Sequence, residues 1–434
     1  MSRVTNRFVP PPPSVTIEPV GSIYRGGAVL SRRVIPLLTL ACAVCVATIY
    51  FPQAISPLIA ADLRVTPSAA AQTATGAQLG YALGVFLLVP LGDRLRARPL
   101  IVVLMVLTAA AMLAAGLATS LPVLLIAGTL AGVFTVVPQV IIPMVAGLVP
   151  DNRRGAVVGT LLGGVLAGIL LARTFGGTLG SWLGWRAPYL VAAAVILVLA
   201  AVLAVTVPRT EPSAQHNYPS LLAEALRLLR REPELRRSAL YQVLLFGGFS
   251  AAWTCLALLI SGPRYGLGAQ TVGLIGLAGA VSVFVTPIAG RWIDRRGPEP
   301  VSTIAIVGVV ASAGVLAFGL LGGIAGLVLL IAGLVLLDTA VQANQVANQS
   351  RIFALLPEAR SRLNTAYMTC TFLGGTLGSW LGVQAYDLFG WGAVAALIAL
   401  AALAALGRHL ARRSTAAPGT PEPASSAPSA ATPR

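Results

Sequence analysis

The sequence contains no lysine, so all 30 of its basic residues are arginines. A Walker A loop needs a lysine that reaches the nucleotide phosphates, and its absence excludes ATP hydrolysis by that route. Schiff-base catalysis by lysine is excluded for the same reason. Histidine is nearly absent too: His216 lies in a polar linker and His409 near the end of the chain. Neither is expected to serve a proton relay inside a membrane.

Charged residues make up only 10% of the chain, whereas a typical soluble domain has about 25%. Hydrophobic residues make up 56%, and the mean hydropathy is +0.84. A soluble protein of this length would need a charged surface that the composition cannot supply, so we expect an integral membrane protein. The net charge of +16 does not indicate nucleic-acid binding, because the arginines lie in short segments between apolar runs.

The four cysteines all lie inside apolar segments, at Cys42, Cys45, Cys255 and Cys370. Cys42 and Cys45 form a Cys-x-x-Cys pair, but no further metal ligands follow it. Free cysteine packs as a small hydrophobic residue. We therefore interpret all four as packing residues and expect neither a metal site nor a cofactor.

Twelve apolar stretches recur along the chain, each of about the 20 residues that a helix needs to cross a bilayer. They lie at 34–58, 73–91, 99–118, 122–148, 155–177, 188–207, 239–261, 271–290, 301–321, 324–348, 363–385 and 391–407. The fold class that this pattern predicts is an all-α integral membrane protein. Its twelve transmembrane helices form two six-helix pseudo-symmetric bundles.

The bundles are expected at 34–207 and 239–407, joined by a cytoplasmic linker at 208–238. Disordered cytoplasmic tails are expected at 1–33, which is rich in proline, and at 408–434. Inside the linker, three leucines share one helical face among arginines, which predicts a helix lying on the membrane surface. These leucines are Leu222, Leu226 and Leu229.

Arginines gather on one side of the predicted membrane. They are Arg94, Arg96, Arg98, Arg153, Arg154, Arg291, Arg295, Arg296, Arg351, Arg360 and Arg362, with those of the linker and tails. The loops of the other side hold only Arg64, Arg186 and Arg264. Positively charged loops remain in the cytoplasm. We therefore expect a multi-pass plasma-membrane protein with both termini in the cytoplasm.

Two Asp-Arg segments occupy the same position in the two halves, after the second apolar stretch of each. The first contains Gly92, Asp93 and Arg94, and the second contains Gly290, Asp294, Arg295 and Gly297. Recurrence of the pair in one local setting indicates two related halves, and membrane transporters are often built from such a duplicated unit.

These features resemble the major facilitator superfamily over about residues 34–407. The second Asp-Arg segment matches the family's loop pattern, G-x-x-x-D-R-x-G, whereas the first has Val89 and Arg96 at the glycine positions. The resemblance implies that both segments clamp the cytoplasmic side when the transporter faces outward. The alternative is a pair of basic loops that serve only to orient the chain in the membrane.

The fifth stretch resembles the family's antiporter signature, G-x8-G-x3-G-P-x2-G-G. Its glycines are Gly159, Gly168, Gly176 and Gly177. Ala172 and Arg173 replace the Gly-Pro pair, and the arginine usual in the fourth span of proton-coupled relatives is missing. The chain is most similar to bacterial exporters of the drug:proton antiporter type. A segment repeated at Gly176–Gly184 and Gly374–Gly382 is interpreted as small-residue helix packing used twice.

Asp338 lies inside the stretch at 324–348, and charged residues there are costly enough to be functional candidates. At about 1.5 Å per residue it is roughly 16 Å from the cytoplasmic end, near the midplane. Gln342, Gln345 and Gln349 continue one polar face suited to lining a cavity. Burial disfavours a charged carboxylate, so Asp338 is the proton-coupling candidate. The alternative is a structural aspartate whose hydrogen bonds neighbouring helices satisfy.

Arg173 is the second charged residue inside a predicted span. It lies roughly 27 Å from the cytoplasmic end, so a direct pair with Asp338 would have to close about 10 Å of depth. Three roles stay open for it. It attracts an anionic group, it pairs with Asp387 near the outer end of the eleventh stretch, or it reaches the lipid interface as a snorkelling side chain.

Further polar and aromatic residues lie on the predicted spans, several of them on the first, fourth, seventh and tenth, which line the cavity in the resembled fold. For each one, simple helix packing is the alternative. With Arg173, the substrate-cavity candidates are Tyr50, Gln53, Gln78, Tyr81, Gln139, Tyr241, Gln242, Trp253, Gln342, Gln345 and Tyr367.

We therefore expect an alternating-access secondary transporter that exports a small amphipathic or drug-like molecule in exchange for protons. Few fixed charges line its cavity helices, which favours neutral or hydrophobic cargo over sugars or phosphates. The alternative is a proton-coupled importer of a small metabolite or sugar. An intramembrane enzyme is not expected, because no histidine, lysine or paired carboxylate lies at membrane depth. The expected partners are the substrate, protons and lipid, without nucleic acid or an ATPase subunit.

Overall fold

The computed structural model describes residues 34–208, 218–356 and 359–415, and every regular element in these ranges is helical. Helices satisfy all their backbone hydrogen bonds internally, which is what a chain crossing lipid requires. The expected tail at 1–33, His216 and most of the tail expected from 408 lie outside the described residues.

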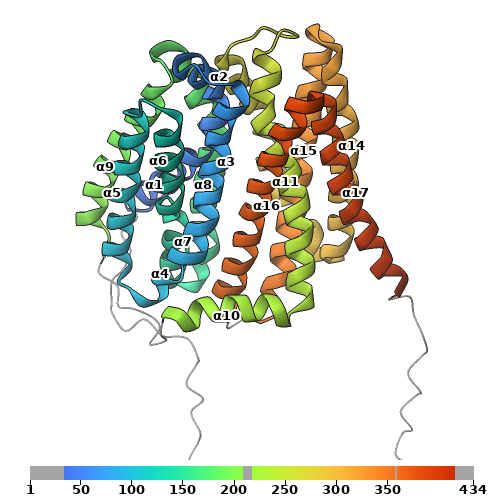
Figure 1. Cartoon of the computed structure of the whole chain (residues 1–434). Helices are drawn as coiled ribbons and strands as arrows, with labels where there is room; N and C mark the ends of the chain where they lie inside the picture. Colours follow the sequence, from blue (N-terminus) through green and yellow to red (C-terminus); the bar gives the residue numbers. More distant parts are fainter. Residues whose placement is uncertain (1–33, 209–217, 357–358, 416–434) are drawn as a thin grey trace, which may run out of the picture.

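The first half of the chain runs from α1 to α9 (Figure 1). Its helices are α1 (Val34–Tyr50), α2 (Pro52–Leu63), α3 (Pro67–Leu88), α4 (Leu91–Arg94), α5 (Ala97–Gly116), α6 (Leu121–Phe134), α7 (Val137–Leu148), α8 (Asp151–Leu183) and α9 (Arg186–Thr206). Helix α10 (Tyr218–Arg231) lies in the linker and runs across the lower end of the molecule in Figure 1.

The second half runs from α11 to α17. Its helices are α11 (Pro233–Ser261), α12 (Ala269–Ala278), α13 (Val281–Arg296), α14 (Pro298–Ala317), the short 3-10 helix η1 (Phe318–Leu321), α15 (Gly323–Phe353), α16 (Arg360–Phe389) and α17 (Trp391–Thr415). Helix α17 continues through Thr415, so residues 408–415 are helical rather than part of the disordered tail expected from 408.

Each of the twelve expected stretches coincides with one helix or with two consecutive helices. Over the described ranges, nine helices are long and apolar enough to cross a membrane, and ten if α1 and α2 form one span bent by 46°. The remaining expected spans, at 271–290 and 363–385, correspond to α12 with α13 and to α16. The all-α membrane fold is confirmed, and twelve spans are consistent with it.

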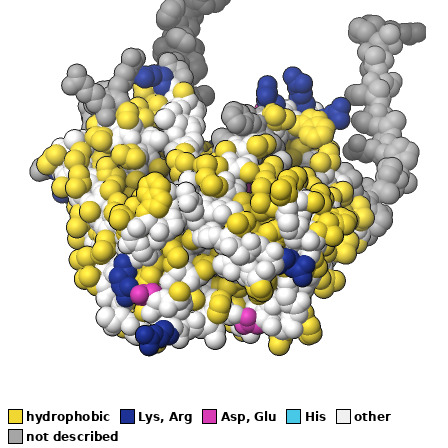
Figure 2. All heavy atoms as spheres, turned by 90° about the horizontal axis from the view of Figure 1, so that it is seen from above, with side chains coloured by type: hydrophobic (Ala, Val, Ile, Leu, Met, Phe, Trp, Pro, Cys, Tyr) yellow, Lys and Arg dark blue, Asp and Glu magenta, His cyan; other side chains and the backbone are white. Residues whose placement is uncertain are grey.

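The two ends of the bundle differ in charge. We call the end that carries α4, α10 and the last turn of α13 the arginine-rich end, because Arg94, Arg227 and Arg295 are exposed there. We call the end that carries α2 the opposite end. Figure 2 shows the molecule from this opposite end, where only a few scattered charged side chains stand out among apolar ones.

Helix α10 packs across the arginine-rich end of both halves. The Tyr218 hydroxyl donates a hydrogen bond to the Leu87 carbonyl at 2.6 Å, and partial burial raises the pKa of this phenol. Glu224 forms an ion pair with Arg362 at 2.5 Å. The expected amphipathic helix is therefore present, but its buried residues are Leu221 and Ala225, and Leu226 from the expected face is half exposed.

The two halves meet along α3 with α16, α8 with α12, and α2 with α11. Glycines make the closest of these approaches possible. A Cβ at Gly177 of α8 would lie 2.4 Å from the Ala269 carbonyl oxygen of α12. Within the second half, a Cβ at Gly378 of α16 would lie 2.1 Å from the Gly247 carbonyl oxygen of α11. Both glycines belong to the repeated segment, which confirms its role in close helix packing.

Candidate functional site

Arg173 of α8 is fully buried although it carries a charge. Its Nε donates a hydrogen bond to Oε1 of Gln53 on α2 at 2.9 Å. The guanidinium carbon lies 3.8 Å from the ring centre of Trp253 on α11. The rings of Tyr50 and Phe249 flank it at 5.4 and 5.7 Å. Cation–π attraction holds a guanidinium on aromatic faces, so Arg173 is seated among three rings.

Trp253 also binds the second charged residue. Its indole Nε1 donates a hydrogen bond to Oδ1 of Asp338 on α15 at 2.9 Å, and Asp338 is buried. One indole therefore carries Arg173 on its face and Asp338 at its edge. We call the chain formed by Gln53, Arg173, Trp253 and Asp338 the central link. It joins α2 and α8 of the first half to α11 and α15 of the second.

Glycines of α12 and its C-terminal end leave room for the central link. A Cβ at Gly276 would lie 3.1 Å from the Cβ of Arg173. A Cβ at Gly279 would lie 2.7 Å from Oδ2 of Asp338, closer than real Cβ contacts come. Any side chain at Gly279 would therefore displace the carboxylate.

Two of the three roles considered for Arg173 are wrong. Asp387 is exposed and accepts a hydrogen bond from Ser68, so it is not the partner of Arg173. Arg173 does not reach the lipid interface either, because its side chain is fully buried and contacts Gln53 of the first half and Trp253 of the second. The Trp253 indole lies between Arg173 and Asp338 and contacts both. The depth difference expected between the two residues was estimated from the helix ends, which ignores helix tilt and the length of an arginine side chain.

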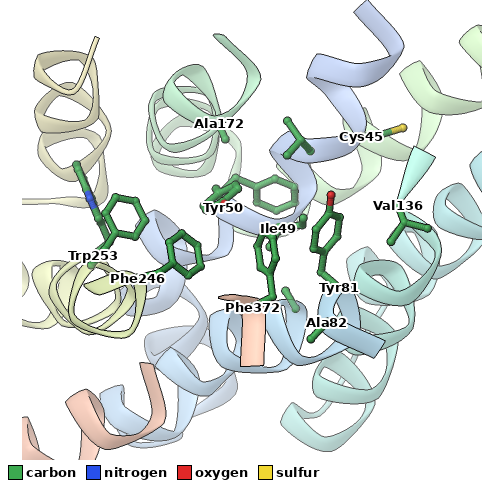
Figure 3. Packing of buried hydrophobic residues seen from close by; sticks show 14 of the residues in the cluster. Cys45, Ile49, Tyr50, Tyr81, Ala82, Val136, Ala172, Phe246, Trp253 and Phe372 are labelled. Atoms are coloured by element: carbon green, nitrogen blue, oxygen red, sulfur yellow. The ribbon is translucent and has the colours of Figure 1, made fainter. Parts of the chain in front are cut away.

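A row of aromatic rings continues from the central link across the interface between the halves (Figure 3). The ring centres are separated by 6.4 Å from Trp253 to Phe249, 5.3 Å from Phe249 to Phe246, 5.3 Å from Phe246 to Phe372, and 4.4 Å from Phe372 to Tyr81. We call these five residues the aromatic row. The phenylalanines were not predicted from the sequence, although the helical spacing of Phe246, Phe249 and Trp253 places them on one face.

Hydrogen bonds between α3, α11 and α16 hold the halves together beside the row. The Ser250 hydroxyl donates to Oε1 of Gln78 at 3.0 Å. The Ser379 hydroxyl lies 2.7 Å from that of Thr75 and 2.9 Å from that of Thr254. Gln78 was a sequence candidate, but its partners were missed because serine and threonine are common in packed membrane helices.

The polar face expected on α15 is divided between two environments. Gln342, Gln345 and Gln349 are half-buried. Asn344 is fully buried and donates a hydrogen bond to Oε1 of Gln242 at 3.0 Å, while Nε2 of Gln242 lies 3.4 Å from Oε1 of Gln345. The sequence candidates Gln242 and Gln345 are therefore joined to each other.

In the first half, Nε2 of Gln139 donates a hydrogen bond to the Tyr81 hydroxyl at 3.3 Å. These two candidates therefore meet at the far end of the aromatic row. Among the contacts of the described residues, none joins the candidates Gln342, Tyr241 or Tyr367 to the central link. Tyr367 is fully buried on α16.

A second buried arginine lies at the arginine-rich end. Arg351 of α15 donates from Nη1 to Ser238 and Asn348 at 3.2 and 2.7 Å, and from Nη2 to Ser302 at 3.1 Å. Oε1 of Glu299 lies 3.3 Å from its Nε. We call this group the end network. The sequence placed Arg351 among the orienting loop arginines, but the structure buries it in the last turn of α15.

Tyr241 and His409 belong to the end network rather than to a central site. Their rings lie 5.6 Å apart, edge to face. His409 is buried, with Nε2 2.8 Å from the Thr303 hydroxyl and Nδ1 3.9 Å from Oε2 of Glu299. Glu299 also accepts a hydrogen bond from Arg237.

The two Asp-Arg segments are helical turns at the arginine-rich end, not loops. Asp93 and Arg94 are the last two residues of α4, with Asp93 half-buried and Arg94 exposed. Asp294 and Arg295 are exposed in the last turn of α13. Gly297 has a φ of 77°, a conformation that glycine favours, and it ends α13 directly before α14.

No cluster of three or more histidine, cysteine or acidic side chains that could hold a metal ion occurs among the described residues. Cys42, Cys45, Cys255 and Cys370 are all free thiols. The chemistry of the site is therefore that of one buried carboxylate, one buried guanidinium and the aromatic rings around them.

The sequence pattern of the Major Facilitator Superfamily matches residues 37–337. The chain is similar to the uncharacterised transporter YgaY of Escherichia coli, with 36% identity over 365 residues, which cover 84% of this chain and 92% of YgaY. It is also similar to the transporter SCO4007 of Streptomyces coelicolor, with 37% identity over 386 residues, which cover 89% of this chain and 88% of SCO4007.

Solved transporter structures share the fold. The nucleoside transporter NupG superposes with a TM-score of 0.67 at 15% identity and covers 87% of this chain and 98% of its own. A bacterial homologue of the human lysosomal transporter Spinster, inward-facing and occupied, gives 0.62 at 16% identity and covers 87% of this chain and 93% of its own. At these identities the likeness concerns the fold alone.

Proposed function

The chain belongs to the Major Facilitator Superfamily, and from that premise we propose that it is a proton-coupled secondary transporter that exports small amphipathic molecules. The observation that carries the proposal is the central link, in which a buried carboxylate of one half is tied through one indole to a buried guanidinium of the other. A proton bound there acts directly on a contact between the halves.

Asp338 is the proton-binding group in this proposal. When it is ionised, its hydrogen bond from Trp253 is charge-assisted and therefore strong. When it is protonated, that bond weakens, and the indole holds Arg173 less firmly. A bound proton shifts a conformational equilibrium only through such a difference between states. Protonation of Asp338 would thus loosen the contact between α8 and α11 and favour exchange between the two access states.

The cargo would bind along the interface between the halves. The aromatic row and Tyr50 offer faces for an apolar body, and Gln53 and Gln139 offer polar contacts. An amphipathic molecule matches this mixture better than a sugar, which would need a dense set of hydrogen-bonding side chains. Neither NupG nor the Spinster homologue determines the cargo, because their identities to this chain are low.

The arginine-rich end is the cytoplasmic end in this proposal, and the inner membrane is the location. Arginines at α4, α10 and the end of α13 would be retained in the cytoplasm by the positive-inside rule. Both termini then lie in the cytoplasm. The Asp-Arg turns containing Asp93 and Asp294 would close the cytoplasmic side when the transporter faces outward.

Proton movement in inside-out vesicles tests the proposal. Vesicles acidified inside and loaded with a pH-sensitive dye would receive a panel of lipophilic drugs and metabolites. Proton release on addition of one compound, seen in vesicles with the wild-type protein and absent from vesicles without it, would establish exchange and identify the cargo. Asp338→Asn is expected to abolish the response at equal protein levels.

Asp387→Asn is the matched control, because it removes an exposed carboxylate that is bonded to Ser68. It should retain the wild-type response. A proton response that survives in Asp338→Asn would overturn the role of Asp338. Compound-driven proton entry into right-side-out vesicles, without exchange in inverted ones, would replace export by proton-coupled import.

A further inference from the structure

The guanidinium of Arg173 keeps two donor groups without an acceptor. Its Nε is bonded to Gln53, but Nη1 and Nη2 are buried and have no hydrogen-bond partner. Leaving a charged donor buried and unsatisfied is expensive. Buried polar groups in native proteins are nearly always bonded, and each exception calls for a ligand, a water molecule or a functional reason.

The contacts of Arg173 with Trp253 and Gln53 fix the direction in which these donors point. Trp253 lies against the face of the guanidinium at 3.8 Å, and Gln53 holds the Nε side. An aromatic face attracts the positive charge but accepts no hydrogen bond from the edge of the group. The two Nη groups therefore form a preoriented fork, which is the geometry that binds a planar carboxylate through two parallel hydrogen bonds.

Among the described residues, no carboxylate accepts a hydrogen bond from this fork. Asp338 is the acidic residue nearest along the central link, but it lies beyond the indole, bonded to Nε1 of Trp253 through Oδ1. Its Oδ2 lies beside Gly279. Asp62 is paired with Arg186 at 2.5 Å and Asp387 with Ser68. No side chain of the described residues accepts a hydrogen bond from the two Nη groups, so a bound ligand or a water molecule would supply the acceptor.

We propose that Arg173 is the subsite for the carboxylate of an amphipathic monocarboxylate cargo, whose apolar body packs on the aromatic row. The proposal rests on the transporter function proposed above and names its substrate class. The subsite is closed in this structure, and cargo reaches it when α8 and α12 separate at their glycine contacts. The donor fork of Arg173 beside aromatic faces would select an amphiphile with a carboxylate over a neutral one, because only the carboxylate accepts two charge-assisted hydrogen bonds.

Binding without a proton gradient tests the subsite independently of transport. Purified protein in detergent would be titrated with 1-naphthaleneacetate and 4-phenylbutyrate, and with the uncharged primary amide of each. Melting temperature and calorimetry would report binding. Wild-type protein is expected to bind the acids. It should bind the amides with at least about tenfold lower affinity, because a bidentate charge-assisted pair is lost.

Variants at Arg173 assign the effect to one side chain. Arg173→Gln is expected to remove the preference for acid over amide, and Arg173→Lys to retain part of it, since lysine keeps the charge but not the fork. Arg186→Gln is the matched control, because it removes an arginine at the opposite end. An unchanged preference in a folded Arg173→Gln protein would overturn the subsite, as would the absence of acid binding to the wild type.

The same titration in Asp338→Asn separates the subsite from the direction of transport. Loss of the ionised carboxylate frees the indole and disturbs the position of Arg173 between the aromatic rings, which weakens cargo binding. Exchange of cargo for a proton requires this sign, because the bound proton must then weaken the binding of cargo. It also removes a negative charge that repels the cargo, which strengthens binding. Weaker acid binding in Asp338→Asn supports export by exchange. Stronger binding would indicate cotransport and overturn the export proposal while leaving the carboxylate subsite intact.

Discussion

Arg173 and Arg351 are both buried arginines in the membrane bundle, but they differ in what surrounds them. Arg351 has hydrogen bonds from both Nη groups and an ion pair with Glu299. Arg173 has one hydrogen bond, three aromatic rings and two unsatisfied donors. The partners of Arg351 all come from the second half of the chain, whereas Arg173 lies between the halves.

This difference separates a structural role from a functional one. A buried guanidinium with both Nη groups bonded and a carboxylate beside its Nε holds helices of one half in a fixed arrangement. A buried charge with donors left over is unfavourable in the state seen here, and such a group persists where another state or a ligand satisfies it. In the proposed mechanism, the end network belongs to the rigid part of the protein, and the central link to the part that changes during transport.

The largest expected difference comes from replacing each arginine by methionine. Arg351→Met leaves Ser302 and Ser238 without the arginine that donates to them and leaves Glu299 with Arg237 but not Arg351, and we expect a loss of about 2 kcal/mol in stability. The loss stays below the roughly 3–5 kcal/mol of a fully buried pair because Glu299 is 39% exposed. Arg173→Met removes an under-satisfied charge, and we expect no loss of stability or a small gain.

Thermal unfolding of both variants in the same detergent checks this contrast. Asp338 can become neutral by binding a proton when Arg173 is absent, so the Arg173→Met protein should remain folded. Arg173→Met should also lose binding of carboxylate cargo, whereas Arg351→Met protein that remains folded should retain it. A melting temperature that falls further in Arg173→Met than in Arg351→Met would contradict the division of roles.

The helices themselves could be predicted from the sequence, because membrane spans depend on long apolar runs that are read residue by residue. Asp338 was identified as a candidate for the same reason, since a charge in such a run is rare. The central link could not be predicted as a unit. Helical periodicity shows which residues share a face of one helix, but not which faces of two helices meet.

Arg351 illustrates the opposite error. Near the end of an apolar run it resembled an orienting loop arginine, yet α15 extends to Phe353 and buries it. Its partner Glu299 is distant in the sequence, and no local pattern connects the two. Likewise the spacing of Phe246 and Phe249 predicts that they share one face of a helix. Phe372 joins them only through the packing of α16 on α11, which the spacing does not predict.

An intermediate effect is expected from the indole at the centre of the link. Trp253→Phe keeps an aromatic face for Arg173 but removes the donor to Asp338. Loss of one hydrogen bond to a charged group is worth about 1.5 kcal/mol, so proton-coupled transport should fall about tenfold. Coupling is measured as proton release per cargo moved in inverted vesicles.

Trp391→Phe is the control for this variant. Its buried indole also donates one hydrogen bond, to the Leu316 carbonyl at 2.7 Å, but within the second half alone. We expect reduced stability with unchanged coupling. Equal loss of coupling in both variants would mean that the Trp253 bond has no special part in transport.

The smallest expected effect comes from one methyl group beside the central link. In Gly279→Ala the new Cβ would lie 2.7 Å from Oδ2 of Asp338, so the carboxylate must shift while the helices stay in place. Crowding of this size costs about 1 kcal/mol, and we expect coupling to fall roughly fivefold. Gly314→Ala on α14, where no atom lies within 4 Å of the new Cβ, should leave coupling unchanged. If Gly279→Ala also transports like the wild type, then the position of Asp338 does not limit coupling, and the contrast between the central link and the end network lies in charge alone.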